Sequence, residues 1–308
     1  MDRLRLLLWG AALSLALPAA AERPRFEGPG VRDPLADREL EAAQGMRRRG
    51  DFAAAAAAYE SFAEHHPHSR RWAQALTAAA ELHHWQLEAP AVAARLYERA
   101  LEAPSDLPGV MPALTQRLSL ERDRGGSLAE LELIEHLLLR RSNAEYAPYL
   151  LLRAAKLLDS ELHDPARALE TAQRAVVRAA KTSWSDDALF LEASLLRRVG
   201  RAPEALRAWR QIIASQEPSL IVGEYDSDLL DDAYYQVAVT LEASDPRAAE
   251  EAYRAVAAEV PASVWVDDAL WSARRLAQAR GDAAQAAKDL ERLTAARPAS
   301  RHLKARAK

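Results

Sequence analysis

Histidine and aspartate are the residue types whose spacing in this chain could support metal binding or acid–base chemistry. Two groups of histidines are close in sequence: His65, His66 and His68, and then His83 and His84. The first group falls at the expected end of one helix and in the following turn, and the second near the far end of the next helix. Fifteen residues separate His68 from His83, which is about 22 Å of helix. One ion cannot bridge that span, so we interpret these histidines as solvated helix-end and helix-surface residues and predict no metal site.

Pairs of adjacent aspartates could suggest two carboxylates that share a proton in acid–base catalysis. The pairs are Asp186–Asp187, Asp231–Asp232 and Asp267–Asp268. Adjacent residues on a helix do not face each other, and the pair recurs in an equivalent sequence context. Carboxylates near a helix N-terminus interact favourably with the helix dipole. We therefore interpret the pairs as stabilising helix starts.

Other catalytic and cofactor motifs are absent from the sequence. The chain contains no cysteine, so a thiolate nucleophile, a disulfide and a cysteine-ligated zinc are excluded. It also lacks the Gly-x-Ser-x-Gly, glycine-rich phosphate-binding and His-Glu-x-x-His motifs. The formal net charge of −4 argues against nucleic acid as the main partner. The sequence predicts no catalytic residue, no cofactor and no enzymatic activity.

The elements that must position these residues form an internal repeat. A second helix recurs in which, in most copies, an alanine precedes a large apolar residue by four positions, so both lie on one helix face. These pairs are Ala55 and Tyr59, Ala93 and Tyr97, Glu130 and Ile134 (a weaker copy), Ala168 and Ala172, Ala205 and Trp209, Ala249 and Tyr253, and Ala286 and Leu290. Successive pairs are 37 or 38 residues apart, with one gap of 44. Such a period predicts stacked helical hairpins.

Turns and first helices have their own signatures. Gly50, Gly200 and Gly281 stand where a helix should end at a positive φ angle. The first helices share a frame with Ser or Thr in the third place and the aspartates in the seventh and eighth, as in Pro261–Leu270. The same frame begins at Ala180 and Tyr225. We predict that the Ser or Thr is the helix N-cap.

These residues resemble the tetratricopeptide repeat, in the variety found in bacterial envelope proteins. The turn Gly-Asp, the Ala and Tyr, the closing Pro and the frame Ser-x-x-x-Asp-Asp-Ala-Leu are similar to repeats of the outer-membrane assembly factor BamD and of the Tol-Pal-associated cell-division coordinator. The resemblance implies a periplasmic scaffold that binds other proteins. The chain departs from the first family because it has no cysteine for a lipid anchor, and from the second because residues 22–37 are too short and proline-rich for a coiled coil.

We therefore predict an all-α fold: a right-handed superhelical solenoid of about seven tetratricopeptide-like helix hairpins over residues 38–298. Residues 1–21 combine a basic start, a twelve-residue apolar run and an alanine-rich site, which is typical of a signal peptide cleaved before Glu22. Residues 22–37 are expected to be a flexible lead-in, and residues 299–308 a solvated basic tail. The expected location is the periplasm, with a peripheral position at the outer membrane as an alternative, and we expect no transmembrane segment after cleavage.

The candidate partner-binding residues come from the C-terminal repeats. Phe190, Tyr235 and Trp271 each follow the Asp-Asp-Ala step. By resemblance to the repeat, this position points toward the inner wall, where aromatic rings could stack on a peptide; packing between hairpins is the competing interpretation. Arg197, Arg198 and Arg275 follow on the same helices. The longer gap contains the apolar triplet Leu220, Ile221 and Val222, which either packs onto the solenoid or contacts a partner.

The function predicted from these features is recognition. The chain is expected to be a non-catalytic periplasmic scaffold or adaptor that binds protein partners through the concave face of its solenoid, in envelope assembly or cell division. The alternative is an accessory subunit or degenerate relative of a peptidoglycan-processing enzyme that contacts cell-wall glycan. A catalytic domain after residue 298 would support that alternative.

Overall fold

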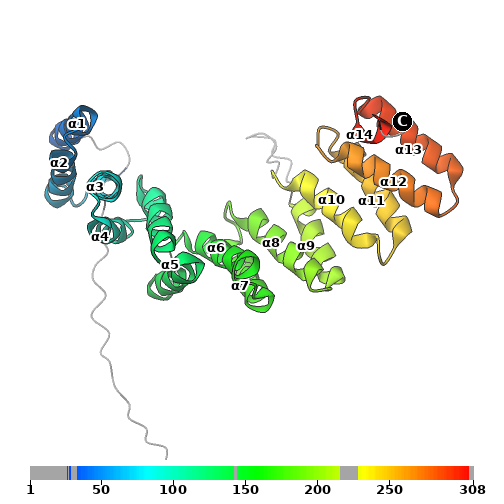
Figure 1. The fold of residues 1–308 in the computed structure, drawn as a ribbon, viewed down its shortest axis with the longest axis horizontal. Helices are drawn as coiled ribbons and strands as arrows, with labels where there is room; N and C mark the ends of the chain where they lie inside the picture. The colour runs from blue at the N-terminus through cyan, green and yellow to red at the C-terminus, as the bar shows by residue number, and fades with distance from the viewer. Residues whose placement is uncertain (1–25, 27, 29–32, 142–143, 216–227, 305–308) are drawn as a thin grey trace, which may run out of the picture. The chain divides into compact units, whose positions relative to one another are not determined.

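The computed structural model describes residues 26, 28, 33–141, 144–215 and 228–304. Every regular element in these residues is helical (Figure 1). The helices are α1 (Pro34–Arg49), α2 (Phe52–His65), α3 (Trp72–Trp85), α4 (Pro90–Ala100), α5 (Val110–Arg140), α6 (Ala147–Ser160), α7 (Pro165–Ala179), α8 (Ser185–Arg198), α9 (Ala202–Ala214), α10 (Leu230–Leu241), α11 (Pro246–Glu259), α12 (Val266–Ala279), α13 (Ala283–Ala296) and α14 (Arg301–Lys304). The predicted all-α repeat fold is confirmed.

The predicted hairpins correspond to successive helix pairs. Over the described residues the pairs are α1–α2, α3–α4, the two segments of α5, α6–α7, α8–α9, α10–α11 and α12–α13. The break inside α5 is at Gly126, where φ is 72° and ψ is −165°, so Val110–Gly125 and Ser127–Arg140 are separate helical segments. The weaker copy around Ile134 thus belongs to a real second helix.

The four-residue spacing marks the core, as expected. Ala205 and Trp209 of α9 are fully buried, as are Ala93 and Tyr97 of α4. A small residue one turn from a large one lets neighbouring helices approach closely and interdigitate. Apolar burial of this kind supplies the main stabilisation of each hairpin.

Helix ends follow the predicted signals in part. Gly50, Gly200 and Gly281 have φ of 84°, 80° and 83°, the left-handed conformation that glycine adopts without strain. The predicted N-cap role of the Ser or Thr is wrong in detail. Ser263 precedes the start of α12 by three residues and accepts a hydrogen bond from the Trp265 amide (3.0 Å), so it caps a short turn ahead of the helix.

The chain divides into two compact units, Met1–Arg117 and Leu118–Lys308. In the first, α1 begins at Pro34, inside the expected lead-in, because the Asp33 side chain caps it by accepting from the Leu35 and Ala36 amides. In the second, α10 to α13 follow one another as neighbouring helices joined by short turns (Figure 1). No helix in the described part of the chain is both long enough and apolar enough to cross a bilayer.

Candidate functional site: the first-helix face of the C-terminal repeats

The residues proposed from sequence lie on the first helices of the second unit. Phe190 is on α8, Tyr235 on α10 and Trp271 on α12, and all three side chains are half-buried. The three positions are equivalent in the repeat, because each follows the Asp-Asp-Ala step by two residues. The contacts of each ring show its structural role.

Tyr235 belongs to a joint between two repeats. The ring of Trp265, which directly precedes α12, stacks on Tyr235 with centroids 4.5 Å apart and an interplanar angle of 15°. The Trp265 indole Nε1 donates to Asp232 on α10 (2.6 Å), and the Ser263 hydroxyl donates to Asp231 (2.7 Å). The aspartate pair of one first helix therefore holds the start of the next.

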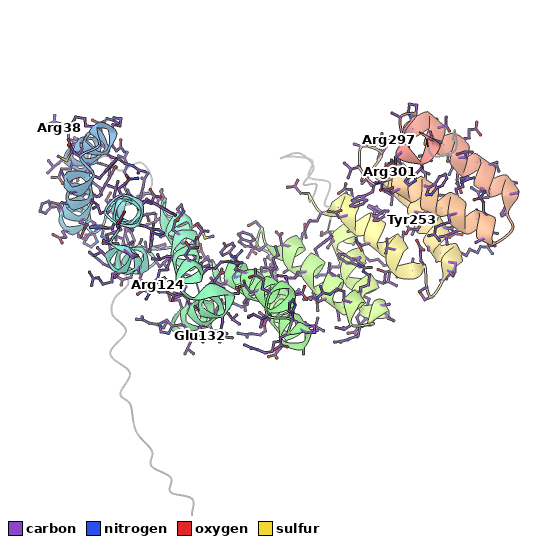
Figure 2. The ribbon with its side chains drawn as sticks, in the orientation of Figure 1. Arg38, Arg124, Glu132, Tyr253, Arg297 and Arg301 are labelled. Atoms are coloured by element: carbon purple, nitrogen blue, oxygen red, sulfur yellow. The ribbon has the colours of Figure 1, made fainter. Side chains whose placement is uncertain are left out.

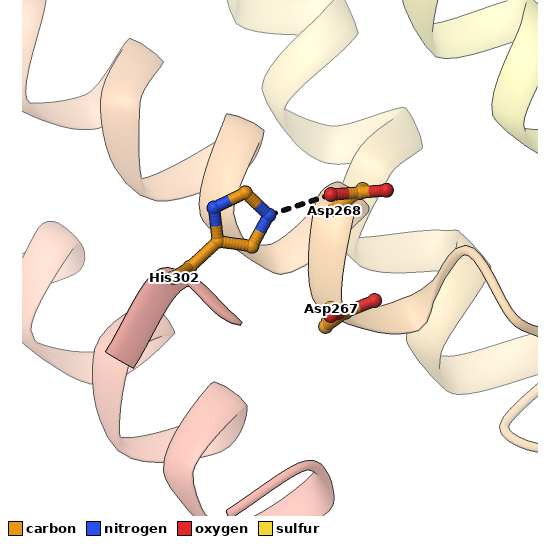
Figure 3. A group of neighbouring side chains, drawn as sticks. All are labelled: Asp267, Asp268 and His302. Carbon is orange, nitrogen blue, oxygen red and sulfur yellow. Dashed lines mark hydrogen bonds and ion pairs between the residues drawn. The ribbon is translucent and has the colours of Figure 1, made fainter. Parts of the chain in front are cut away.

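The same joint recurs at the C-terminal end (Figure 3). The ring of His302, on α14, stacks on Trp271 with centroids 5.0 Å apart and an interplanar angle of 12°. Its Nε2 lies 2.5 Å from a carboxylate oxygen of Asp268, and the Ser300 hydroxyl donates to Asp267 (3.1 Å). Residues 300–302 thus contact α12 in the way that residues 263–265 contact α10.

Two arginines, both labelled in Figure 2, complete this C-terminal joint: Arg301 is the first residue of α14, and Arg297 precedes that helix. Arg301 donates to both carboxylate oxygens of Asp268 (2.6 and 2.8 Å). Arg297 donates to the backbone carbonyls of Pro261 and Ser263 (3.0 and 2.9 Å). The expectation of a solvated tail is therefore wrong for residues 300–302, because these residues are bonded to α12.

Phe190 has a different role from the other two aromatic residues. Its ring packs edge-on against Trp209 of α9, with centroids 4.7 Å apart. Trp209 is fully buried, so this contact belongs to the core of one hairpin. The three aromatic side chains thus all make packing contacts, which is the competing interpretation from the sequence, while part of each ring stays accessible.

The three arginines extend the same helices. Arg197, Arg198 and Arg275 are exposed. Arg198 forms an ion pair with Asp159 of α6, and Arg275 donates to Glu242 (2.7 Å), which also accepts from the Tyr253 hydroxyl (2.5 Å). The triplet Leu220–Val222 lies outside the described residues.

An open cleft of about 750 Å³ adjoins the C-terminal joint. The start of α12 forms one wall, with the exposed Val264 and the ring of Trp265. The connection from α13 to α14 forms the other wall, from Ala296 to Arg301. The cleft therefore offers an apolar surface next to arginines and aspartates, at one end of the first-helix face.

Comparison with known proteins identifies the fold. No protein-family model and no curated protein sequence matches the chain. Among solved structures, the C-terminal part of a TPR repeat-containing protein from Cytophaga hutchinsonii matches with a TM-score of 0.54 and 11% identity, over 85% of this chain and 97% of that one. The chain has the tetratricopeptide-repeat fold.

A second match is a signal-transduction ATPase with numerous domains that carries a tetratricopeptide repeat sensor, from Pyrococcus horikoshii. The TM-score is 0.51 at 14% identity, over 83% of this chain and 40% of that one. Identities this low establish the tetratricopeptide fold alone and leave the partner to be argued from the residues.

One cluster on this tetratricopeptide scaffold has the composition of a metal site. Ligand atoms of Asp267, Asp268 and His302 lie within 4.8 Å of one another (Figure 3). Burial raises the pKa of Asp268, but the hydrogen bonds from Arg301 and His302 outweigh it, so its pKa lies below the usual range. Since the guanidinium already bonds both oxygens of Asp268, a second cation there would be repelled. The donor set fits an ion-paired joint better than a metal centre.

The histidines discussed from sequence are also bonded to acids. His66 Nε2 lies 3.2 Å from Glu39, and His83 Nε2 lies 2.9 Å from Glu60. Both rings are half-buried, so the expectation of solvated histidines is wrong for these two. They tie α2 to α1 and to α3 as separate pairs.

The joint was missed in the sequence because its two sides come from different repeats. Ser263 and Trp265 are 37 residues before Ser300 and His302, and the aspartate pairs at 231 and 267 are 36 residues apart. Aligning Pro298–Leu303 with Pro261–Val266 would have placed residues 299–304 inside the repeat.

Proposed function

We propose that this chain is an exported, non-catalytic scaffold of the bacterial cell envelope that binds protein partners on the first-helix face of its C-terminal repeats. The observation that carries the proposal is the repeated joint. Trp265 and His302 each link one first helix to the next through a stacked ring and a carboxylate. A face held in this way is ordered before a partner arrives, so binding costs less conformational entropy.

The chemistry of the face suits a protein segment. Half-buried aromatic residues share the first helices α8, α10 and α12 with exposed arginines, and these residue types dominate the energetics of protein interfaces. The cleft at its end adds an apolar recess lined by charged residues of both signs. A partner with an apolar side chain and flanking charges would match it.

The envelope location rests on the first residues and on the resemblance. A basic start, an apolar run of twelve residues and the small residues before Glu22 are typical of a signal peptide. The repeat signature is similar to that of envelope scaffolds in assembly and division. Cell fractionation with N-terminal sequencing tests this part: we expect a periplasmic protein that begins at Glu22. Membrane-bound protein that retains Met1 would contradict it.

Crosslinking in intact cells followed by mass spectrometry tests the partner. We expect a recurrent envelope protein whose crosslinks fall on α8, α10, α12 and the α13–α14 connection. Crosslinks confined to the second helices α9, α11 and α13 would contradict the assignment of the face. A recurrent adduct to cell-wall glycan with no protein partner would contradict the class of partner.

A further inference from the structure

A second surface of the second unit is formed by residues other than those of the first-helix face of α8, α10 and α12. It is a groove of about 500 Å³ between the end of α5, the start of α6 and the length of α7. Its lining residues are Leu138, Ala147, Leu151, Glu170, Gln173, Arg174, Val177 and Arg178. Nothing in the proposed function uses these residues.

One wall of the groove is a single stripe of α7. Its residues 170, 173, 174, 177 and 178 are spaced as i, i+3, i+4, i+7 and i+8, the spacing that places side chains on one face of a helix. The ion pair between Arg167 and Glu135 (2.9 Å) ties α7 to α5. All the lining residues belong to helices rather than to loops.

The floor of the groove is apolar, and part of its apolar surface is exposed to water. Leu138 packs against the buried cluster around Leu151, and both face the groove. Val177 of α7 also lines the groove and is 76% exposed. Large apolar side chains left in water beside a concave apolar floor mark interaction surfaces.

The rim of the groove is rich in arginine. Arg174 and Arg178 stand one turn apart on α7, and Glu170 is the acidic residue of the lining. This local excess of positive charge stands on a chain whose formal net charge is −4. An acidic ligand would therefore be attracted to this groove more than to the chain as a whole.

We propose that the groove binds an acidic amphipathic segment of a partner protein, which places one or two apolar side chains against Leu138, Leu151 and Val177. Its carboxylates face Arg174. An apolar helix stripe in a hydrophobic groove is a recurrent mode of peptide recognition, and arginine binds carboxylates with two parallel hydrogen bonds. The scaffold thus has two docking surfaces, the first-helix face of α8, α10 and α12 and this groove between α5, α6 and α7.

The test uses the full chain and two labelled synthetic peptides with leucines spaced i, i+3, i+4 and i+7. Glutamate fills the remaining positions of one peptide and lysine those of the other. Fluorescence anisotropy should show binding of the glutamate peptide, with at least tenfold weaker binding for Val177→Glu and for Arg174→Glu. Leu128→Glu is the matched control, because Leu128 is a large apolar residue that is 57% exposed in the same unit and lies outside the groove lining, and this variant should bind as the wild type does.

Three results would overturn the proposal: no binding of the glutamate peptide, equal binding of the lysine peptide, or binding that neither groove variant weakens. A further arm of the test measures whether the chain sediments with vesicles of phosphatidylglycerol. If the chain sediments with them and Val177→Glu and Arg174→Glu release it, while the glutamate peptide does not bind, the groove is a membrane-contact surface instead. The groove variants change residues of α7 only, so this test leaves the residues of the first-helix face unchanged.

Discussion

The indole nitrogen of Trp265 lies 2.6 Å from a carboxylate oxygen of Asp232, thirty-three residues earlier in the chain. The same indole stacks on Tyr235, three residues further along α10. One tryptophan therefore contacts two positions of the preceding first helix, one through a charged hydrogen bond and one through ring stacking. His302 does the same with Asp268 and Trp271.

The first prediction concerns the hydrogen bond in this joint. Trp265→Phe keeps a ring on Tyr235 but removes the N–H that reaches Asp232, so the unfolding free energy should fall by about 1.5 kcal/mol, as for other hydrogen bonds to a charged group. A cycle with Asp232→Ala, measured by chemical denaturation, should give a coupling of at least ~0.5 kcal/mol. Strictly additive effects would mean that the two groups do not interact.

The second prediction concerns pH. Because the folded pKa of Asp268 is lowered, the Asp268 contacts contribute stability that is present above the unfolded pKa of about 3.9 and is lost as pH falls through the folded value. Amide hydrogen exchange of residues 299–304, corrected for intrinsic rates, should therefore be slow at pH 7 and accelerate below pH ~4. Asp268→Asn should show the faster exchange already at pH 7. Equal protection of the variant and the wild type at pH 7 would contradict the role of this carboxylate.

The third prediction concerns Glu130, which is fully buried on α5. Its carboxylate bonds Arg122 (3.1 Å) and Arg153 of α6 (2.7 Å). Glu130→Gln should cost about 3 kcal/mol, the lower end for a broken buried pair, since both arginines keep some access to water. The exposed Glu132 is the control, and Glu132→Gln should change stability by less than ~0.5 kcal/mol. Similar denaturation midpoints for the two variants would contradict this account.

The fourth prediction concerns the small residues of the repeat. Ala205 is fully buried in α9, and Ala205→Trp should destabilise the second unit by about 1–3 kcal/mol through overpacking. Arg207 is exposed on the same helix, so Arg207→Trp is the control and should change stability by less than ~0.5 kcal/mol. An unchanged thermal melting curve for Ala205→Trp would show that the close helix contact is absent.

The helices could be predicted from the sequence because their signal is local. Ala205 and Trp209, or Ala249 and Tyr253, lie one turn apart, so one stretch of chain contains the whole pattern. The turn glycines could be predicted in the same way, because each ends a helix in a left-handed conformation that depends only on its own turn. The number of hairpins followed from the period.

The joints and ion pairs could not be predicted in the same way. The aspartate pairs were interpreted as helix-start residues, and they do occupy the first turns of α8, α10 and α12. Their bonds to Ser263, Trp265 and Ser300 depend on the stacking of successive hairpins. Glu130 occupies the repeat position that is alanine in the other copies. Only the approach of Arg122 and Arg153 explains a buried carboxylate there.

The central claim is that the first-helix face binds a protein partner, and one matched pair of variants tests it most directly. Arg197 on α8 and Arg207 on α9 are both exposed and belong to the same hairpin, but they lie on its first and second helices. The affinity of the crosslinked partner should be measured by calorimetry for Arg197→Glu and Arg207→Glu, with circular dichroism to confirm that both fold. We predict at least a tenfold loss for Arg197→Glu, in line with ~2 kcal/mol for an arginine anchor, and wild-type affinity for Arg207→Glu. Equal affinities, or a loss confined to Arg207→Glu, would contradict the account.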